Sequence, residues 1–413
     1  MINRLLSYGF VLASMSLSAY AGDVAEGQAK AGMCAGCHGA NGIGLSDEFP
    51  NLAGQKAAYL VKQLRAFKSG DRQDPSMKAM SAALSDADMQ NLAAYFASLS
   101  PLAVAEKTPV VASASDQASS LEFAESTFVS MKKSATMMSF PTQAVWKGGP
   151  NMLYNAITPD GRLVLSTSPS TNTVYVFDAK SGKQLAIVAV GKAPKGVKVT
   201  PDGQYAYISN QNSANISVLD LKRLSVVATI AVEAGPHNVR FTRSGQWAYV
   251  TLQGGAGLAV IDTVTRKMTQ VIPIPGITGP HNIDLSADEQ TAFVRDFVHH
   301  VAVLDLRTGQ VKQVIKVGKG HGGIDVAPNG KFVATAAIGA DFISVFDPKT
   351  FAVKNIQVGN GPHGIRASKD SRWIYVSITK DNALVVIDAE SMTVVKKIAV
   401  QKFPFWIAVQ GNP

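Results

Sequence analysis

The second part of the chain alternates short apolar segments with polar turns. Ile- and Val-rich runs recur from about residue 144 to 410, separated by turns such as Pro159-Asp160-Gly161 and Pro201-Asp202-Gly203. Apolar and polar positions alternate in Tyr205-Ala206-Tyr207-Ile208-Ser209. This two-residue period is typical of β-strands, and the helical spacing that a TPR or HEAT array needs is absent.

These strands repeat in units of about 42 residues. Each unit starts with Gly-Pro-x or a close variant, passes through an apolar strand and an Asp-Gly-type turn, and continues with further strands. The x position recurs at intervals of 44, 42, 44, 40, 42 and 42 residues, at Asn151, Lys195, His237, His281, His321, His363 and Phe405. Pro precedes it except at His321, where Gly320 stands. Four short strands per unit at this period predict the blades of a β-propeller.

A propeller ring must close, and this requirement predicts the number of blades. Six units are complete, and a seventh begins at residues 405–409. We expect 405–410 to supply the inner strand of the last blade, residues before Asn151 to supply its outer strands, and Ala144 to Trp146 to be the outermost. Residues 123–140 would then belong to this blade. Seven blades are predicted, with six or eight as alternatives.

The first part of the chain predicts helices instead. Residues 23–33 have a helical pattern, and a later helix begins at Ser85, with Asp86 and Asp88 in its first turn. Residues 1–21 resemble a secretory signal, with Arg4, an apolar stretch and the small-residue cleavage pattern Ala19-Tyr20-Ala21. The predicted domains are therefore 1–21 signal peptide, 22–100 helical domain, 101–138 linker and 139–413 propeller. A membrane anchor is the less favoured interpretation of 1–21.

Cys34-Ala35-Gly36-Cys37-His38 is the attachment pattern of a c-type haem. The two thiols form thioethers to the vinyl groups, and the imidazole of His38 lies under the iron. A thiol-oxidoreductase motif would not predict the His and would follow a strand. The sixth iron ligand should be a thioether or a second His, and no other His lies in the first 236 residues. Met77 and Met80, expected in a loop, are the candidates.

Residues 22–100 resemble a class I cytochrome c of the small bacterial c4/c5/c553 kind. The similarity rests on the haem motif, on Phe49-Pro50-Asn51-Leu52-Ala53-Gly54-Gln55 and on Leu84-Ser85-Asp86. In that family the axial Met lies seven residues before the Leu-Ser pair, which implies Met77, with Met80 as the fallback. The resemblance also implies that the carbonyl of Pro50 accepts a hydrogen bond from His38. Such a domain carries electrons.

Residues 144–410 resemble YVTN-type propeller repeats, as in Tyr249-Val250-Thr251 and Tyr375-Val376-Ser377. A cytochrome c joined to a propeller also resembles, in architecture, the cytochrome cd1 nitrite reductases and their d1-haem relatives. Those propellers have eight blades and use more chain than is available here. The resemblance implies an all-α cytochrome c domain followed by an all-β propeller, and the fold alone does not fix the function.

Six histidines besides His38 gather at one predicted face. His237, His281, His321 and His363 occupy the same position in four successive blades, which faces the mouth of the central channel. His299 and His300 lie in a turn that opens on the same side, with Lys195 and Arg295 nearby. These residues either stabilise the Gly-Pro-x loops or form a site. Imidazoles suit copper, other metals or a haem-like ligand such as d1, and the two cations suit carboxylates.

Composition narrows the class of protein. The chain has 413 residues, which suits two or three domains, and is 46% hydrophobic and 17% charged, which suits a folded protein. The net charge of +9 is spread without a dense basic run, so nucleic-acid binding is not predicted. Both cysteines belong to the haem motif, so a disulfide framework is excluded. Met131, Met137 and Met138 are more typical of packing than of a soft-metal site.

The leading hypothesis is a periplasmic oxidoreductase: a haem c electron carrier joined to a propeller with a His-lined cofactor, metal or substrate site. It would exchange electrons with a partner protein, possess no membrane span after signal cleavage and act on an unidentified small molecule. The alternative is a non-enzymatic electron carrier whose propeller docks a partner. A lactonase-like hydrolase ranks third, because the seven x positions contain no acidic metal ligand.

Overall fold

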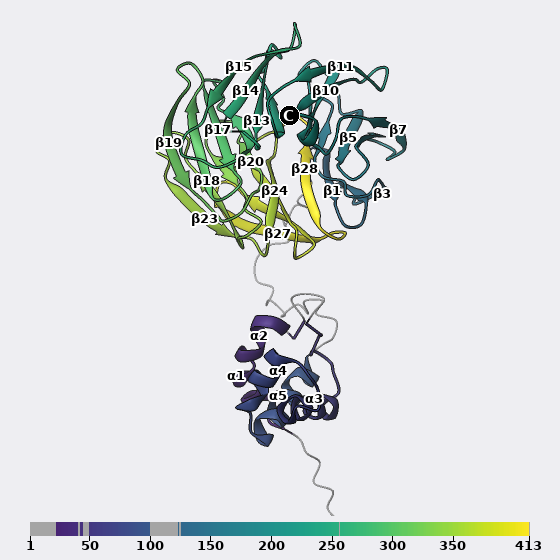
Figure 1. The fold of residues 1–413 in the computed structure, drawn as a ribbon, viewed down its shortest axis with the longest axis vertical. Coiled ribbons are helices and arrows are strands. Elements are labelled where there is room, and N and C mark those ends of the chain that lie inside the picture. Colours follow the sequence, from purple (N-terminus) through teal and green to yellow (C-terminus); the bar gives the residue numbers. More distant parts are fainter. Residues whose placement is uncertain are drawn as a thin grey trace, which may run out of the picture. The chain divides into compact units, whose positions relative to one another are not determined.

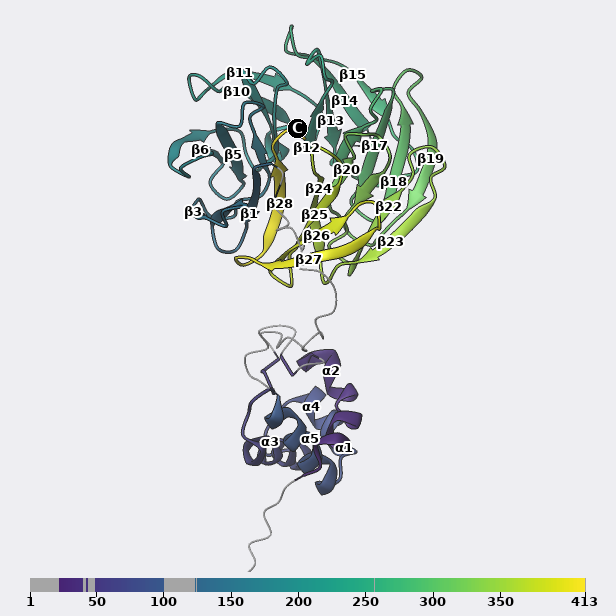
Figure 2. The same ribbon diagram turned by 180° about the vertical axis from the view of Figure 1, so that it is seen from behind.

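The computed structural model describes residues 22–39, 42–43, 49–99, 123, 125–255 and 257–412. The chain divides between residues 116 and 117 into two compact units, one helical and one all-β (Figures 1 and 2). The predicted signal segment 1–21 and most of the predicted linker lie outside the described residues. No helix in the described part of the chain is long and apolar enough to span a membrane.

The described residues of the first unit form five helices: α1 (Val24–Lys30), α2 (Gly32–His38), α3 (Ala57–Ser69), α4 (Pro75–Ala82) and α5 (Asp86–Ser98). As predicted, Ser85 caps α5, in a reciprocal capping box with Asp88. The core contains Leu60, Met89, Leu92 and Phe96. Gly27 allows α1 to cross α5 closely, because a Cβ at this position would lie 2.0 Å from the backbone oxygen of Asn91.

Seven four-stranded antiparallel sheets form the second unit, and the first strands of adjacent sheets contact one another around the channel. The seven-bladed propeller predicted from the repeats is therefore confirmed. Written from the innermost strand outward, the blades are β4 (Asn155–Ile157), β5 (Leu163–Ser168), β6 (Thr173–Asp178), β7 (Gln184–Ala189); β8 (Pro194–Val199), β9 (Tyr205–Asn210), β10 (Asn215–Asp220), β11 (Ser225–Ala231); β12 (Pro236–Phe241), β13 (Trp247–Leu252), β14 (Gly257–Asp262), β15 (Lys267–Pro273); β16 (Pro280–Leu285), β17 (Thr291–Asp296), β18 (His300–Asp305), β19 (Gln310–Lys316); β20 (Ile324–Val326), β21 (Val333–Thr335), β22 (Phe342–Phe346), β23 (Val353–Gln357); β24 (Pro362–Ala367), β25 (Trp373–Ile378), β26 (Ala383–Asp388), β27 (Thr393–Ala399); and β28 (Pro404–Val409), β1 (Thr127–Met131), β2 (Thr136–Phe140), β3 (Val145–Lys147).

The last blade closes the ring with the two ends of the propeller segment. Yellow β28 lies beside β1 in Figures 1 and 2, and Val129 pairs with Ile407. This is the predicted closure, with β3 as the outermost strand. The predicted boundary at residue 139 is wrong, because β1 and most of β2 precede it. Met131, Met137 and Met138 are buried in the cores on either side of this blade, which confirms their packing role.

The Gly-Pro-x pattern has a structural cause in the innermost strands. Gly235, Gly279 and Gly361, which precede the Pro, have φ values of 71°, 61° and 74°, a left-handed conformation that favours glycine. The strand register then shifts immediately after the Pro in β8, β12, β16 and β24. Such a bulge redirects the side chain at the x position. The repeat thus places one x residue per blade at the same end of the channel.

Candidate functional site

Helix α2 carries the predicted haem-attachment residues. Cys34, Cys37 and His38 lie on its last turn and a half, where residues three and four apart share a face. Both thiols are free, and Cys37 is exposed while Cys34 is partly buried. The His38 side chain is buried, at 5% exposure. The helix therefore presents two unpaired thiols and a buried imidazole in the order that a covalent haem requires.

The imidazole of His38 is held by one backbone group. Its Nδ1 lies 2.9 Å from the carbonyl oxygen of Pro50. A carbonyl only accepts, so Nδ1 carries the proton and Nε2 is left with a lone pair for a metal. The ring of Phe49 packs edge-on at 6.2 Å. The contact implied by the cytochrome resemblance is thus present in the structure.

Both candidate methionines lie on helix α4 rather than in a loop, so the loop expectation is wrong. Asp74 caps this helix by accepting from the backbone N–H of Met77 at 2.8 Å, and Pro75 begins it. Met77 is partly buried and Met80 is 37% exposed. The assignment of Met77 as the axial ligand remains a prediction.

The four x-position histidines converge at the channel mouth. Ring centroids are 3.9 Å apart for His237 and His281, 5.0 Å for His281 and His321, and 5.2 Å for His321 and His363. We call these four residues the histidine cluster. The next x residue, Phe405, continues the series at 3.9 Å from the ring of His363. Equivalent positions in successive blades have therefore produced one continuous set of ring contacts.

Tyr154 completes this arrangement on the other side. Its ring lies 5.4 Å from that of His237 and 5.7 Å from that of Phe405, and it packs on Trp406 at 4.5 Å. Burial raises the pKa of its hydroxyl far above the ordinary value, so the phenol is neutral. Tyr154 lies three residues after the x position of its blade, and this offset kept it out of the sequence prediction.

Burial keeps the histidine cluster neutral. It lowers the pKa of His237 to about 3, helped by the charge of Lys195. It lowers the pKa of His321 to about 4, helped by Arg295, and places the pKa values of His281 and His363 well below the ordinary value. The Nδ1 of His363 faces the carbonyl of Phe405 at 3.0 Å, while its buried Nε2 has no hydrogen-bond partner among the residues that the structure describes. That lone pair suits a metal ion.

Three cations surround the cluster. Arg295 is fully buried, and its Nη2 donates to the carbonyls of Gly318, at 2.9 Å, and Gly320, while Nε and Nη1 have no partner in the described part of the chain. Burial lowers its pKa to about 10, which leaves it charged at neutral pH. Burial lowers the pKa values of Lys195 and Lys132, helped by the charge of Lys132 for Lys195 and by that of Lys133 for Lys132.

Lys132 was missed because the sequence prediction placed it in the linker. It lies between β1 and β2, with its Nζ 5.4 Å from the ring of Phe403 and 5.6 Å from that of Phe405. The position of Lys132 could have been derived from the predicted closure of the ring. In a blade whose inner strand is β28, the β1–β2 turn corresponds to the β17–β18 turn that carries His299.

The β17–β18 turn reaches the same channel mouth, as predicted. Phe297 of this turn stacks on His321, with centroids 4.7 Å apart and an interplanar angle of 3°. His299 and His300 contact each other at 4.0 Å but are not part of the cluster. Asp296 instead holds them in the turn, accepting from both backbone N–H groups and lying 3.2 Å from Nδ1 of His300.

The copper prediction gains no support from this geometry. Within the described residues, no group of three or more His, Cys, Asp or Glu side chains is arranged to hold a metal ion. The reason is visible in the rings: they stack and pack on one another, and two Nδ1 atoms face backbone carbonyls. A single imidazole facing a ligand is compatible with this arrangement, and a copper site shared by several of the histidines stays a prediction.

Comparison with known proteins identifies both parts. The cytochrome D1 heme domain model matches residues 67–285, which is more than half of the chain. This chain belongs to the cytochrome D1 heme domain family. A cytochrome c model matches residues 24–100 of this D1-family chain. The cytochrome c domain implies a covalent haem c, and the chain is therefore a cytochrome c electron-transfer domain fused to a d1-type propeller.

Relatives of the helical domain are small cytochromes. It is 46% identical over 98 residues to cytochrome c4 of Pseudomonas aeruginosa, a match covering 24% of this chain and 49% of the relative. It is 43% identical over 81 residues to cytochrome c-554(548) of Halomonas halodenitrificans, covering 19% of this chain and 98% of the relative. The D1-family chain thus spans about half the length of the cytochrome c4 relative but nearly all of the smaller protein.

A solved structure shares the whole two-domain fold. The structure titled dihydro-heme d1 dehydrogenase NirN in complex with DHE matches with a TM-score of 0.55 at 19% identity, covering 94% of this chain and 99% of that chain. At this identity the similarity shows the fold alone. The alternative of eight blades is wrong for this chain, because its described residues form seven four-stranded sheets that close into a ring.

Proposed function

We propose that this chain is an exported redox protein in which haem c exchanges electrons with a d1-class tetrapyrrole held at the histidine cluster. The observation that carries this proposal is the contact series of His237, His281, His321 and His363 at the channel mouth of a D1-family propeller. When bound, such a macrocycle supplies an iron centre able to accept or release single electrons.

The helical domain would hold the first redox centre. Cys34 and Cys37 would form the two thioether bonds, and His38 with Met77 would supply the axial ligands. The role of His38 as an iron ligand is supported by Pro50, because its carbonyl fixes the proton of His38 on Nδ1 and leaves Nε2 available. Ligation by His and Met leaves no open iron position, so this domain would carry electrons rather than bind substrate.

The propeller residues suit an anionic aromatic ligand. His363 offers a buried Nε2 lone pair without a partner, which makes it the favoured iron ligand of the cluster. Arg295, Lys132 and Lys195 would hold carboxylate side chains of the macrocycle. Arg295 supports this role because it keeps two N–H-bearing nitrogens unpartnered in a fully buried position. Tyr154, Phe297 and Phe405 offer apolar ring surface that excludes water.

The electron partner would be a second exported protein. The predicted signal segment and the haem c motif favour the periplasm, where c-type haem is attached. The helical domain resembles small cytochromes, so we expect it to receive or deliver one electron per encounter. The propeller would then oxidise or reduce a small molecule, which makes the chain an oxidoreductase.

Reconstitution tests this function directly. The full chain, purified with covalent haem c, is incubated with extracted haem d1, with protohaem in a parallel sample, and then desalted. We expect one equivalent of haem d1 to be retained per haem c, and protohaem to be retained poorly. His363→Ala should lower retention at least tenfold, by removal of the iron ligand, while the haem c spectrum stays unchanged.

A matched control separates ligand loss from damage to the fold. Tyr207→Phe alters a buried ring away from the channel mouth and should retain haem d1 as the parent does. Failure of the parent protein to retain haem d1 would overturn the proposed function and favour a docking role for the propeller. Equal retention by the parent and His363→Ala would overturn the role of His363.

A further inference from the structure

The opposite end of the channel carries a second constellation of charged residues. Each of the seven innermost strands contributes one side chain to the same level of the channel. In the regular strands it is the fifth residue, and in the short strands it is the residue with the equivalent pairing to the second strand of the blade. These residues are Ala156, Lys198, Arg240, Asp284, Asp325, Arg366 and Ala408. Three cations, two carboxylates and two alanines therefore share one level of the channel. We call this set the basal ring.

The two carboxylates of the basal ring are already neutralised. Asp284 is fully buried, pairs with Nε of Arg240 at 2.6 Å and accepts from the backbone N–H groups of Leu285 and Val326. Asp325 is equally buried and pairs with Arg366. Each carboxylate thus forms an ion pair with the arginine of a neighbouring blade. One of the three cations of the ring is not used in these pairs.

That cation is Lys198. It is 9% exposed, and within the described part of the chain it forms no hydrogen bond or ion pair. Burial lowers its pKa well below the ordinary value, and the charges of Arg366 and Arg240 add to this effect, while those of Asp284 and Asp325 oppose it. Both nearby carboxylates are already paired with arginines, so Lys198 has no ion pair of its own among the described residues, and an anion beside it would stabilise its protonated form.

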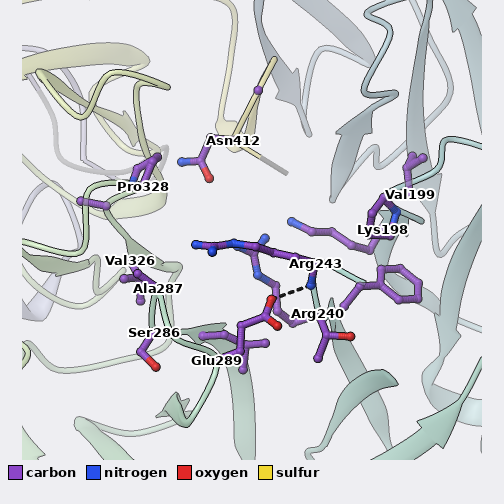
Figure 3. A pocket seen from close by; sticks show the side chains of 16 residues that line it. Lys198, Val199, Arg240, Arg243, Ser286, Ala287, Glu289, Val326, Pro328 and Asn412 are labelled. Carbon is purple, nitrogen blue, oxygen red and sulfur yellow. Dashed lines mark hydrogen bonds between the residues drawn. The ribbon is translucent and has the colours of Figure 1, made fainter. Parts of the chain in front are cut away.

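Two adjoining cavities receive the Lys198 side chain. One, of about 280 Å³, is lined by Lys198, Arg240 and Arg243, and Figure 3 shows the ammonium pointing into it. The other, of about 260 Å³, is lined by Lys198 and Arg366 together with Ala156 and Ala408. The two small residues leave space between the two cations. Asn412 lines both cavities and donates to Asp325 at 2.9 Å.

We propose that the basal ring binds a small oxyanion, of the phosphate, sulfate or carboxylate class, between Lys198 and the guanidinium groups of Arg240 and Arg366. Each guanidinium has five N–H groups, of which its ion pair uses only part, so further donors can face the ligand. The site is separate from the histidine cluster, which lies at the other end of the same innermost strands. It is independent of the proposed redox function.

Thermal unfolding of the full haem c protein tests this site. The propeller transition is followed by tryptophan fluorescence, because all four tryptophans lie in the propeller. Potassium phosphate, sulfate and succinate are titrated against potassium chloride at equal ionic strength. We expect at least one of the three oxyanions to raise Tm in a saturable manner, and the three arms distinguish the class.

Two variants and a control give the test its specificity. Lys198→Met keeps the length of the side chain without the charge, and we expect it to weaken oxyanion binding about tenfold or more. Ala156→Leu keeps every charge and fills the cavity, and it should abolish the saturable effect. Lys267→Met, on the exposed outer strand β15, should bind as the parent does.

Three results would overturn the site. The first is the absence of a saturable oxyanion effect in the parent protein. The second is equal stabilisation of the parent and Lys198→Met. The third is a loss of binding in Lys267→Met as large as that in Lys198→Met, which would show general charge screening. If Lys198→Met fails to fold, Ala156→Leu still decides, because it removes the space and leaves Lys198 intact.

Discussion

The Nδ1 atom of His237 lies 3.0 Å from the backbone carbonyl of His281, while the two rings lie 3.9 Å apart. Because the carbonyl only accepts, the proton of His237 is on Nδ1. His363 repeats the contact with the carbonyl of Phe405, the next x residue. In two blades, therefore, the imidazole at the x position donates to the backbone carbonyl of the x residue in the next blade. The position of the next blade thus fixes the orientation of the imidazole.

The neutral state of these imidazoles predicts an acid-sensitive propeller. An unfolded histidine has a pKa near 6.5, while the folded pKa of His237 is about 3. Between these values the unfolded chain binds more protons than the folded one, so the free energy of unfolding falls as pH is lowered. His237 alone should contribute a loss of roughly 3 kcal/mol between neutral pH and about pH 4.5.

Urea unfolding at several pH values, read by tryptophan fluorescence, measures this slope. His237→Gln cannot titrate in this range, so its stability should fall less steeply with acid than that of the parent, by up to about 1.4 kcal/mol per pH unit. The comparison uses slopes, because the substitution also removes a hydrogen bond. Equal slopes in the two proteins would show that His237 is not held neutral.

Substitution of the two α4 methionines should identify the axial ligand of haem c. We expect Met77→Ala to remove the absorption band typical of sulfur–iron ligation and to lower the midpoint potential by a few tenths of a volt, on a scale of ~0.8 V set by axial ligands. Met80→Ala should change neither property. The reverse pattern would assign Met80, and two unchanged spectra would exclude both.

The repeat made most of the propeller predictable. Gly-Pro-x recurs with the blades, so the blade number, the closure by β28 and the common end of the histidines could be derived from spacing. Lys132 and Tyr154 could not be placed in the same way. Lys132 belongs to the one blade assembled from both ends of the segment, and Tyr154 reaches the channel from an irregular stretch before the short strand β4.

The basal ring was also outside the sequence prediction. Its members are Lys, Arg, Asp and Ala at equivalent positions, so no recurring residue type marks these positions in the sequence. The pairing of Asp284 with Arg240 depends on contact between blades 44 residues apart, and the spare charge of Lys198 appears only when both ion pairs are known. Similarly, the helix at Met77 is set by the Asp74 cap and Pro75, signals that lie within the predicted loop.

Ring closure should depend on buried residues of β28. Ile407 is fully buried, pairs with Val129 of β1 and packs in a core formed by β1 and β2 of its own blade and β25 and β26 of the adjacent blade. Ile407→Ala leaves a cavity and should destabilise the propeller by about 2–5 kcal/mol. Val395→Ala, at a 41% exposed position of β27, should cost about 0.5 kcal/mol or less.

Urea unfolding of the propeller compares these two variants, and haem c absorbance reports on the helical domain in the same sample. We expect Ile407→Ala to lower only the propeller transition. Similar losses for both variants would show that β28 is no more important for closure than an exposed outer strand. A loss of haem c absorbance would indicate general misfolding instead.

Arg295 gives the sharpest test of how the propeller holds an anionic macrocycle. It stays charged, with a pKa of about 10, and its Nη2 donates to the carbonyls of Gly318 and Gly320 while Nε and Nη1 remain unpartnered. Lysine keeps the charge but lacks the planar fork in which Nη2 binds the two carbonyls while Nε and Nη1 face a carboxylate. Arg295→Lys should therefore weaken retention of haem d1 by roughly tenfold or more, since a charged hydrogen bond contributes about 1.5–3 kcal/mol.

The matched control is Arg266→Lys. Arg266 lies between the outer strands β14 and β15 and packs on the ring of Tyr205, so this variant should retain haem d1 fully. Unchanged retention in Arg295→Lys would show that the buried guanidinium only supports the backbone between β19 and β20.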